Sequence, residues 1–415
     1  MYKKEQRSVD KGKSLSVSPE EIKSLAESLT DEVTGLRRDF HQHPELSHRE
    51  ERTARVAAAY LQNLGLEVET GIAGHGVAAT LKGAQPGRVI AFRADMDALP
   101  IREAVEVPWR SKHEGVMHAC GHDFHLSLAL GAARLIGRLK DRLAGTYRFI
   151  LQPAEEGPPQ GRATGAQGMV AAGVLDKPRV DAILGLHVAP TLDVGNIRYG
   201  KDVVMAGSDH LTITVTGKSA HGATPHRGVD PILASAQALT QIKAFLSQEI
   251  DTRHPVVLTF GRIEGGNRFN ILADKVILEG SLRYLTDAVR LQVITGMKRH
   301  LAGLAKATGA KIELVHTPIY PILRNDPRLS DLAVRLLGRI LGAKSLQVHH
   351  PAMGSEDFSY FAAKVPAFYF FLGVRTPGTR GQALHSPEFN PDEKALPFGL
   401  GAVAGLMAAL AGEKI

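Results

Sequence analysis

The sequence predicts an α/β fold, in which a mixed, largely parallel sheet flanked by helices is interrupted by an inserted ferredoxin-like α+β domain. Two observations predict it. Four apolar strand-like runs are separated by helical or long stretches, as in buried sheets whose strands are joined by crossovers. These runs are Arg88–Arg93, Thr146–Gln152, Val180–Leu186 and Ala367–Leu372. Between about Arg198 and Pro318 the order is strand-helix-strand-strand-helix-strand, which is the ferredoxin-like pattern.

Helices before the first run carry their own start signals. Ser18-Pro19-Glu20-Glu21 reads as a capping box, and apolar residues then follow at helical spacing as far as Phe40. A second box, Ser47-His48-Arg49-Glu50, predicts a helix that runs to about Leu64. The chain ends in an apolar helix at Pro397–Leu410.

Apolar periodicity divides the inserted segment into alternating strands and helices, as in ordinary globular domains. The expected elements are a strand at His210–Thr216, a helix from Asp230, strands at Val256–Ile263 and Lys275–Leu282, a helix at Leu291–Ala307 and a strand at Lys311–His316.

Composition narrows the class of protein. The 415 residues suggest two or three domains, and 44% hydrophobic with 22% charged residues is typical of globular chains. The net charge of +7 is spread along the chain, which disfavours nucleic acid as a partner. No signal peptide is apparent, no apolar run approaches the length of a membrane span, and a single cysteine suits a reducing compartment. We therefore expect a cytoplasmic protein that binds neither nucleic acid nor membrane.

Polar side chains follow the predicted strands. Asp95 and Asp97 come after the first run, the pair Glu155-Glu156 after the second, and His187 after the third, while His385 lies in the long loop after the fourth. Open α/β sheets bind ligands at the carboxyl ends of their strands. These separate pieces of sequence are therefore expected to meet at one site.

The residue types at that site suggest metal chemistry. Cys120, the only cysteine, is two residues from His122 in a polar loop, and thiolate, imidazole and carboxylate all bind zinc-like ions. One carboxylate of Glu155-Glu156 can bind metal while the other accepts a proton from water. His118 and His125 are expected to be supporting or surface groups.

Without a functional site, Cys120 would be a buried hydrophobic residue and Glu155-Glu156 a solvated acidic turn. A Cys120 thiolate nucleophile activated by a histidine is also possible, but it leaves the carboxylate pair without a role.

The chain resembles the M20 metallopeptidases, and within them the amidohydrolase branch of hippurate hydrolases, N-acyl-amino-acid amidohydrolases and auxin-conjugate hydrolases. The resemblance runs from about Leu36 to Leu410. The matching motifs are Phe40–Ser47, Arg93–Pro100, Met117–Asp123, Gln152–Gly157, Gly185–Val188, Ser219–Ala223, Met353–Phe358 and His385–Phe389.

The resemblance implies two divalent ions per subunit. The donor types favour zinc or manganese and are also compatible with cobalt or nickel. The ligands of the two ions would be Cys120, His122, Glu156, His187 and His385. Glu155 would be the general base that deprotonates the attacking water and delivers the proton to the leaving amine. Asp97 would orient a metal-binding histidine.

The inserted segment resembles the family's lid and dimerisation domain. His221 is similar to a histidine that reaches the substrate carbonyl, often from a partner subunit, while Asn270 and Arg283 match positions that bind the substrate's polar end. Ala273 stands where the family commonly has proline, and His226 where close relatives often have tryptophan. Both departures concern acyl-group specificity and lid closure.

The expected domains are a disordered basic tail (1–17), a discontinuous catalytic metal-binding domain (18–197 and 319–415) and the inserted lid/dimerisation domain (198–318). The expected function is hydrolysis of a small N-acyl amino acid to a carboxylic acid and a free amino acid, by a homodimer or larger homo-oligomer. A dipeptidase or aminopeptidase of the same fold is the alternative. A non-catalytic binding protein is a further one, but such a homologue would be expected to have lost Glu155 or a ligand.

Overall fold

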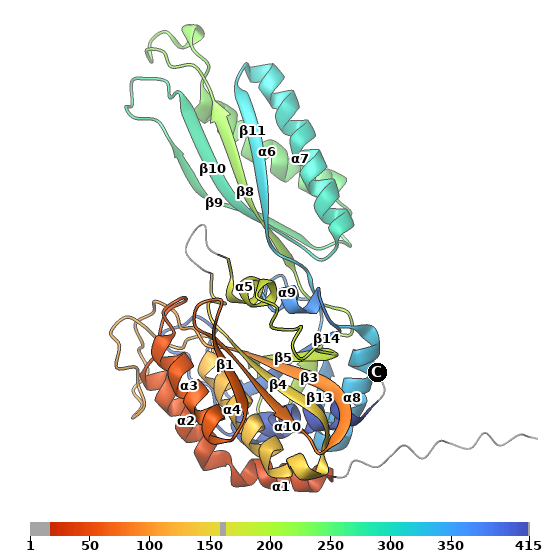
Figure 1. Cartoon of the computed structure of the whole chain (residues 1–415). Helices are drawn as coiled ribbons and strands as arrows, with labels where there is room; N and C mark the ends of the chain where they lie inside the picture. The colour runs from red at the N-terminus through yellow and green to blue at the C-terminus, as the bar shows by residue number, and fades with distance from the viewer. Residues whose placement is uncertain (1–16, 158–162, 414–415) are drawn as a thin grey trace, which may run out of the picture. The chain divides into compact units, whose positions relative to one another are not determined.

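A computed structural model describes residues 17–157 and 163–413 and divides the chain into two compact units (Figure 1). Unit 1 comprises residues 1–199, 326–348 and 365–415, and unit 2 comprises 200–325 and 349–364. The segment 349–364 was expected in the catalytic domain but groups with unit 2, where Met205 bridges Ala352. The expected end of the insertion at residue 318 is likewise too early, since β12 (Leu323–Arg324) pairs with β7 (Val203–Met205).

An eight-stranded mixed sheet forms the centre of unit 1, in the order β1-β2-β4-β3-β5-β14-β6-β13. Its strands are β1 (Glu67–Ile72), β2 (Gly76–Lys82), β3 (Gln85–Asp95), β4 (Ala144–Gln152), β5 (Ala182–Asp193), β6 (Ile197–Tyr199), β13 (Leu346–Val348) and β14 (Ala367–Arg375). The central strands β4, β3, β5 and β14 run parallel, and the four apolar runs fall on them, except that β5 begins at Ala182, two residues after the predicted start at Val180. The predicted fold class is confirmed.

Helices cover this sheet (Figure 1). They are α1 (Pro19–Ser28), α2 (Thr30–Gln42), α3 (Glu51–Asn63), α4 (His122–Leu139), α5 (Gly165–Ala171), α8 (Pro327–Leu341) and α10 (Ala395–Gly412). The helices α4 and α10 pack on β3 and β4, while α1, α2 and α8 pack against α4 and α10. Because α4 and α10 lie between the sheet and other helices, nearly all their residues are buried.

Unit 2 contains an antiparallel sheet in the order β11-β8-β10-β9, with two helices packed against each other and against the sheet. Its main elements are β8 (Gly207–Thr216), α6 (Pro231–Glu249), β9 (Val256–Gly265), β10 (Lys275–Tyr284), α7 (Asp287–Thr308) and β11 (Lys311–Tyr320), followed later by the short α9 (Ser359–Ala362). This is the predicted ferredoxin-like order of elements.

Two local predictions at the N-terminal end are wrong. The single helix expected as far as Phe40 is two helices, broken at Leu29, where the hydroxyls of Ser28 and Thr30 on either side bond back to main-chain carbonyls. Ser47 does not cap α3, since its hydroxyl donates to Asp97. The predicted disordered tail lies outside the described residues except for Val17, which is fully buried in the core.

The expectation that no apolar run reaches membrane-span length is also wrong. By length and composition alone α10 could cross a membrane, and 83% of its 18 residues are buried inside unit 1. Its uniform apolarity is explained by that burial, because a helix enclosed on all sides has no polar face.

Gly165 generates a stability prediction for the turn after β4. Its N–H donates to the Ala154 carbonyl at 3.0 Å, and a Cβ there would lie 1.6 Å from the Pro153 carbonyl oxygen. We expect Gly165→Ala to lower the free energy of unfolding by about 1–3 kcal/mol through overpacking, measured by urea denaturation. The control is Gly137→Ala in α4, where a Cβ meets nothing within 4 Å, and a gain of up to about 1 kcal/mol is expected. Unchanged stability of Gly165→Ala would contradict the packing described.

Candidate metal centre

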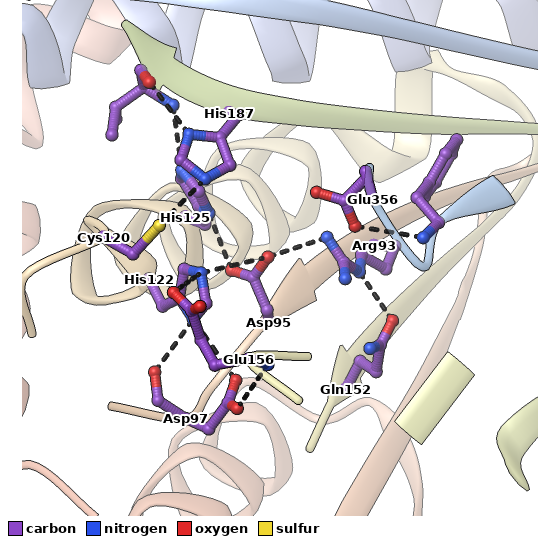
Figure 2. A network of polar contacts seen from close by, with 12 residues as sticks. Arg93, Asp95, Asp97, Cys120, His122, His125, Gln152, Glu156, His187 and Glu356 are labelled. Carbon is purple, nitrogen blue, oxygen red and sulfur yellow. Dashed lines mark hydrogen bonds and ion pairs between the residues drawn. The ribbon is translucent and has the colours of Figure 1, made fainter. Parts of the chain in front are cut away.

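The ends of the central strands of unit 1 bring the predicted ligands together. Figure 2 shows Cys120, His122, Glu156 and His187 of this set. Cys120 and His122 flank Gly121, where α4 begins; Gly121 has a φ of 87°, and a Cβ there would lie 2.4 Å from Val188. Glu156 follows β4, and His385 lies in the loop after β14. His187, expected at a strand terminus, lies within β5, two residues beyond Gly185, where the pairing of β5 with β3 ends.

The donor atoms of these five side chains lie within reach of a common site. Cys120 Sγ is 3.2 Å from His187 Nε2 and 3.3 Å from His385 Nε2. Glu156 Oε1 is 3.2 Å from His385 Nε2 and 3.7 Å from His122 Nε2. Cys120 belongs to two donor groups, one with His122 and His187 and the other with Glu156 and His385, and Glu155 forms a third with His122 and Glu156.

The unsatisfied atoms at this site fit a metal ion. His122 Nε2 is buried and makes no hydrogen bond among the described residues, and the buried Glu156 Oε1 has only its ion-pair contacts with His385 and His122. A buried polar atom without a partner costs free energy, so such atoms usually have a hydrogen-bond partner or an ion. The donors are one thiol sulfur, imidazole nitrogens and a carboxylate oxygen, a combination that binds zinc and similar ions. The residues present therefore fit the metal centre expected from the sequence.

Burial and neighbouring charges together set the pKa values of the donors. Burial, with the nearby Glu156 carboxylate, raises the pKa of the Cys120 thiol well above its usual range. Burial alone would lower the pKa of His122, but the Asp95 carboxylate and a hydrogen bond with Asp97 raise it well above its usual value. Ligands bind metals in their deprotonated forms, so metal binding has to displace protons from this pair.

Asp97 supports two of the candidate ligands. The ring Nδ1 of His122 is 2.8 Å from the Asp97 carbonyl oxygen and 3.2 Å from its Oδ1, so its Nε2 is left for the cluster. Asp97 Oδ2 accepts hydrogen bonds from Ser47 Oγ at 2.6 Å and from the Glu156 amide at 2.9 Å. The structure thus places Asp97 behind a histidine, where the family resemblance expects it.

Sequence reasoning missed the role of Glu50. This residue is fully buried, and its Oε1 accepts hydrogen bonds from the amides of His48 at 3.0 Å and Ala154 at 2.8 Å. Ala154 has a φ of 50°, so Glu50 holds the strained turn that presents Glu155 and Glu156. The only sequence signal at Glu50 is the Ser-x-x-Glu pattern, which fits a capping box equally well.

His118 and His125 are both buried, so neither is a surface group. Neither ring nitrogen of His118 has a hydrogen-bond partner among the described residues, and burial lowers its pKa to about 4. A neutral imidazole is therefore expected there at neutral pH.

The predicted substrate-binding residues belong to unit 2 and so are not part of the compact unit that holds the donor cluster. His221 and Asn270 are neighbours, since His221 bridges Ile271 and the Gly222 amide donates to the Asn270 carbonyl at 2.9 Å. Both are exposed. Arg283 lies on β10, half-buried, and donates to the hydroxyls of Ser281 and Ser355. Of the two departures from the family pattern, Ala273 is buried and His226 is exposed.

A metal-binding hydrolase is the class that this fold and donor set define, and comparison with known proteins gives the family. The model of peptidase family M20/M25/M40 matches residues 91–409, so the chain belongs to that family. It lies in the amidohydrolase branch, because relatives named amidohydrolase, N-acetylcysteine deacetylase and IAA-amino acid hydrolase match it over most of its length.

Three relatives illustrate the similarity. Thermostable carboxypeptidase 2 of Saccharolobus solfataricus is 37% identical over 395 residues, covering 94% of this chain and 98% of that protein. N-acetylcysteine deacetylase of Bacillus subtilis is 37% identical, covering 88% and 93%. The crystal structure of the YXEP protein of Bacillus subtilis, described as a dinuclear metal-binding peptidase of the M20 family, has a TM-score of 0.80 at 33% identity and covers 93% and 99%.

Glu50 generates a pH prediction. Burial, with the nearby Asp97 charge, raises its pKa from 4.5 to about 7, so the folded protein keeps a proton that the unfolded chain releases as pH rises through this window. Glu50 therefore lowers the free energy of unfolding increasingly between pH 4.5 and about pH 7. Above that range the lowering has its full size. Glu50→Gln keeps the acceptor oxygen and cannot ionise. We expect it to raise the free energy of unfolding by about 1–3 kcal/mol at pH 8 and by little at pH 5.

Urea unfolding of chelator-treated protein at both pH values measures this effect. Glu51→Gln is the matched control, because Glu51 is the exposed neighbour at the start of α3 and should show no such pH-dependent gain. An equal effect of Glu50→Gln at pH 5 and pH 8 would contradict the raised pKa.

Proposed function

We propose that the protein is a metal-dependent amidohydrolase that cleaves the amide bond of an N-acyl amino acid to a carboxylic acid and a free amino acid. The observation that carries this proposal is the meeting of Cys120, His122, Glu156, His187 and His385, with Glu155 beside them. Five donors are more than one structural role requires, and the adjacent carboxylate is what hydrolysis needs in addition.

We assign two divalent ions to this cluster, because its side chains form two donor groups, Cys120 with His122 and His187 and Cys120 with Glu156 and His385, that would hold them. A relative described as dinuclear supports this number. Zinc or manganese is favoured, while cobalt and nickel also suit a mixture of sulfur, nitrogen and oxygen donors. When bound, the ions supply Lewis acidity, which polarises an amide carbonyl and makes water easier to deprotonate.

Glu155 is assigned the proton transfers. Its carboxylate accepts a proton from the attacking water and later gives this proton to the leaving nitrogen, which cannot depart as an amide anion. Its position next to Glu156 and near His122 supports this role, since the base must lie beside the ligands. Asp97, through His122 and the Glu156 amide, keeps the two ligands oriented during the reaction.

The substrate class follows from the chemistry that related proteins share. N-acetylcysteine deacetylase and carboxypeptidase are names for enzymes whose substrates carry a free carboxylate on the amine side of the amide. Arg283 suits such a group, because the described part of the chain offers it two hydroxyls and no carboxylate. We assign Asn270 to the same polar end of the substrate. His221 is assigned as a donor to the developing oxyanion, reaching it from a partner subunit of a cytoplasmic homodimer or larger homo-oligomer.

The carboxypeptidase relative favours a second candidate, hydrolysis of a peptide from its carboxyl end. One experiment separates the two. Protein stripped with chelator and resupplied with zinc or manganese is offered N-benzoylglycine, several N-acetyl amino acids and matched dipeptides with free amino groups. Metal-dependent release of amino acid from the acylated substrates alone supports the amidohydrolase. Preference for the dipeptides supports the peptidase, and no release from either set by folded protein contradicts both.

Glu155→Gln tests the general base. We expect at least about a 100-fold loss of kcat with metal content unchanged, because the variant keeps the size of the side chain and loses the proton acceptor. His187→Ala and Cys120→Ser should instead weaken metal binding. Metal analysis after dialysis, together with the hydrolysis assay, measures both effects. Full activity of Glu155→Gln would overturn the assigned role.

Arg283→Gln tests recognition of the carboxylate. We expect KM for N-benzoylglycine to rise about 10- to 100-fold, while turnover of N-benzoylglycinamide, which lacks the carboxylate, changes little. Steady-state kinetics on both substrates gives the comparison. The matched control is Arg262→Gln, since Arg262 lies on the neighbouring strand and is paired with Glu279. Equal losses on the two substrates would refute carboxylate recognition by Arg283.

A further inference from the structure

His125 lies one turn after His122 on α4 and is fully buried beside the donor cluster. Its ring centroid is 4.8 Å from that of His187 and 5.5 Å from that of His122. Together with Asp95 and His122 it offers atoms close enough to hold an ion. Distance alone would therefore make His125 a further metal ligand.

The hydrogen bonds of His125 exclude that role. Its Nε2 lies 3.0 Å from the amide nitrogen of Val188, which can only donate, so Nε2 is the unprotonated acceptor. Its Nδ1 lies 2.6 Å from Asp95 Oδ1 and carries the proton that the carboxylate accepts. Both ring nitrogens are thereby used, and neither has a lone pair left for a metal ion.

Asp95 is held in turn by the guanidinium of Arg93. Arg93 Nη1 donates to Asp95 Oδ2 at 2.7 Å, and Arg93 Nε donates to Gln152 Oε1 at 2.7 Å (Figure 2). Arg93, Asp95 and Gln152 are all buried. With Oδ2 held by the Arg93 guanidinium, Asp95 Oδ1 faces His125 and accepts the proton on its Nδ1.

The Val188 peptide links this network to His187. Strand β5 pairs with β3 only as far as Gly185, so β3 supplies no partner at Val188. His125 Nε2 accepts the Val188 N–H instead, while His187 Nδ1 lies 2.8 Å from the Val188 carbonyl oxygen. With Nδ1 held in this way, His187 Nε2 is directed toward Cys120 Sγ at 3.2 Å.

We propose that His125 is a positioning residue: held by Asp95 as the Nδ1–H tautomer, it fixes the Val188 peptide and thereby aims His187 Nε2 at the donor cluster. The inference rests on the proposed function in taking His187 as a metal ligand. It assigns to Asp95 and His125, which are not ligands, part of the metal affinity of the protein.

Two substitutions separate the two contacts of His125. His125→Gln can place its amide oxygen near the position of Nε2 and keep the Val188 contact. His125→Asn can place its amide N–H near the position of Nδ1 and keep only the Asp95 contact. Metal-free protein is titrated with Co²⁺ and followed by its absorption. We expect His125→Asn to weaken Co²⁺ binding about 10- to 100-fold, approaching His187→Ala, and His125→Gln to weaken it much less.

Hydrogen exchange of the Val188 amide in chelator-treated protein gives a readout that needs no metal. Protection is expected in the wild type and in His125→Gln, with exchange at least about tenfold faster in His125→Asn. Ser127→Ala is the control, since Ser127 is buried on the same helix and bonds only to main-chain carbonyls of α4. It should leave Val188 exchange and Co²⁺ affinity unchanged.

The outcomes distinguish this inference from the proposed function. If His187→Ala weakens Co²⁺ binding and His125→Asn does not, positioning by His125 is wrong and the ligand assignment stands. Normal Co²⁺ binding by His187→Ala would overturn both. Equal losses in His125→Gln and His125→Asn would contradict the role of the Val188 contact. If His125→Asn fails to fold, Asp95→Asn replaces it: this variant sets an amide N–H₂ against Arg93, and wild-type Co²⁺ affinity would overturn the proposal.

Discussion

Desolvation of ionisable groups is the constraint on which the site depends. Cys120, His122, Asp95 and Asp97 are all buried at one edge of the eight-stranded sheet, where an uncompensated charge is costly. Opposite neighbours shift the pKa of His122 upward and those of the two aspartates downward, whereas burial raises the pKa of the Cys120 thiol. Opposite charges within the cluster offset part of this cost, and a bound cation would compensate the Glu156 carboxylate and favour the Cys120 thiolate.

Two aspartates at the end of β3 each bind a different histidine of α4: Asp97 binds His122, and Asp95 binds His125. His122 and His125 are three residues apart and so lie on the same face of the helix. Asp97 bonds to Nδ1 of His122 and leaves Nε2 without a hydrogen bond, whereas Asp95 and the Val188 amide occupy both nitrogens of His125. The partners, rather than the side-chain type, decide which histidine can bind a metal ion.

The sequence predicts the parallel core and the convergence of the donors because both follow from local pattern. Apolar runs predict β3, β4, β5 and β14, and parallel strands bring the residues that follow them to one edge. Predictions failed where a distant partner decides the outcome. Ser47 has the residue type of a helix cap but donates to Asp97, and residues 349–364 join unit 2 through pairing that no local pattern encodes.

Backbone strain at the site shows why the rest could not be predicted. Ala154 and His385 adopt positive φ values of 50° and 61°, a conformation that costs about 1–2 kcal/mol for residues other than glycine. Ala154 is held there from both sides, by Glu50 through its amide and by Gly165 through its carbonyl. His385 is held through its amide, which donates to the Ala119 carbonyl next to Cys120. Since Glu50 and Ala119 lie 104 and 266 positions away from Ala154 and His385, respectively, only the folded protein reveals that these two loops are fixed in place around the donors.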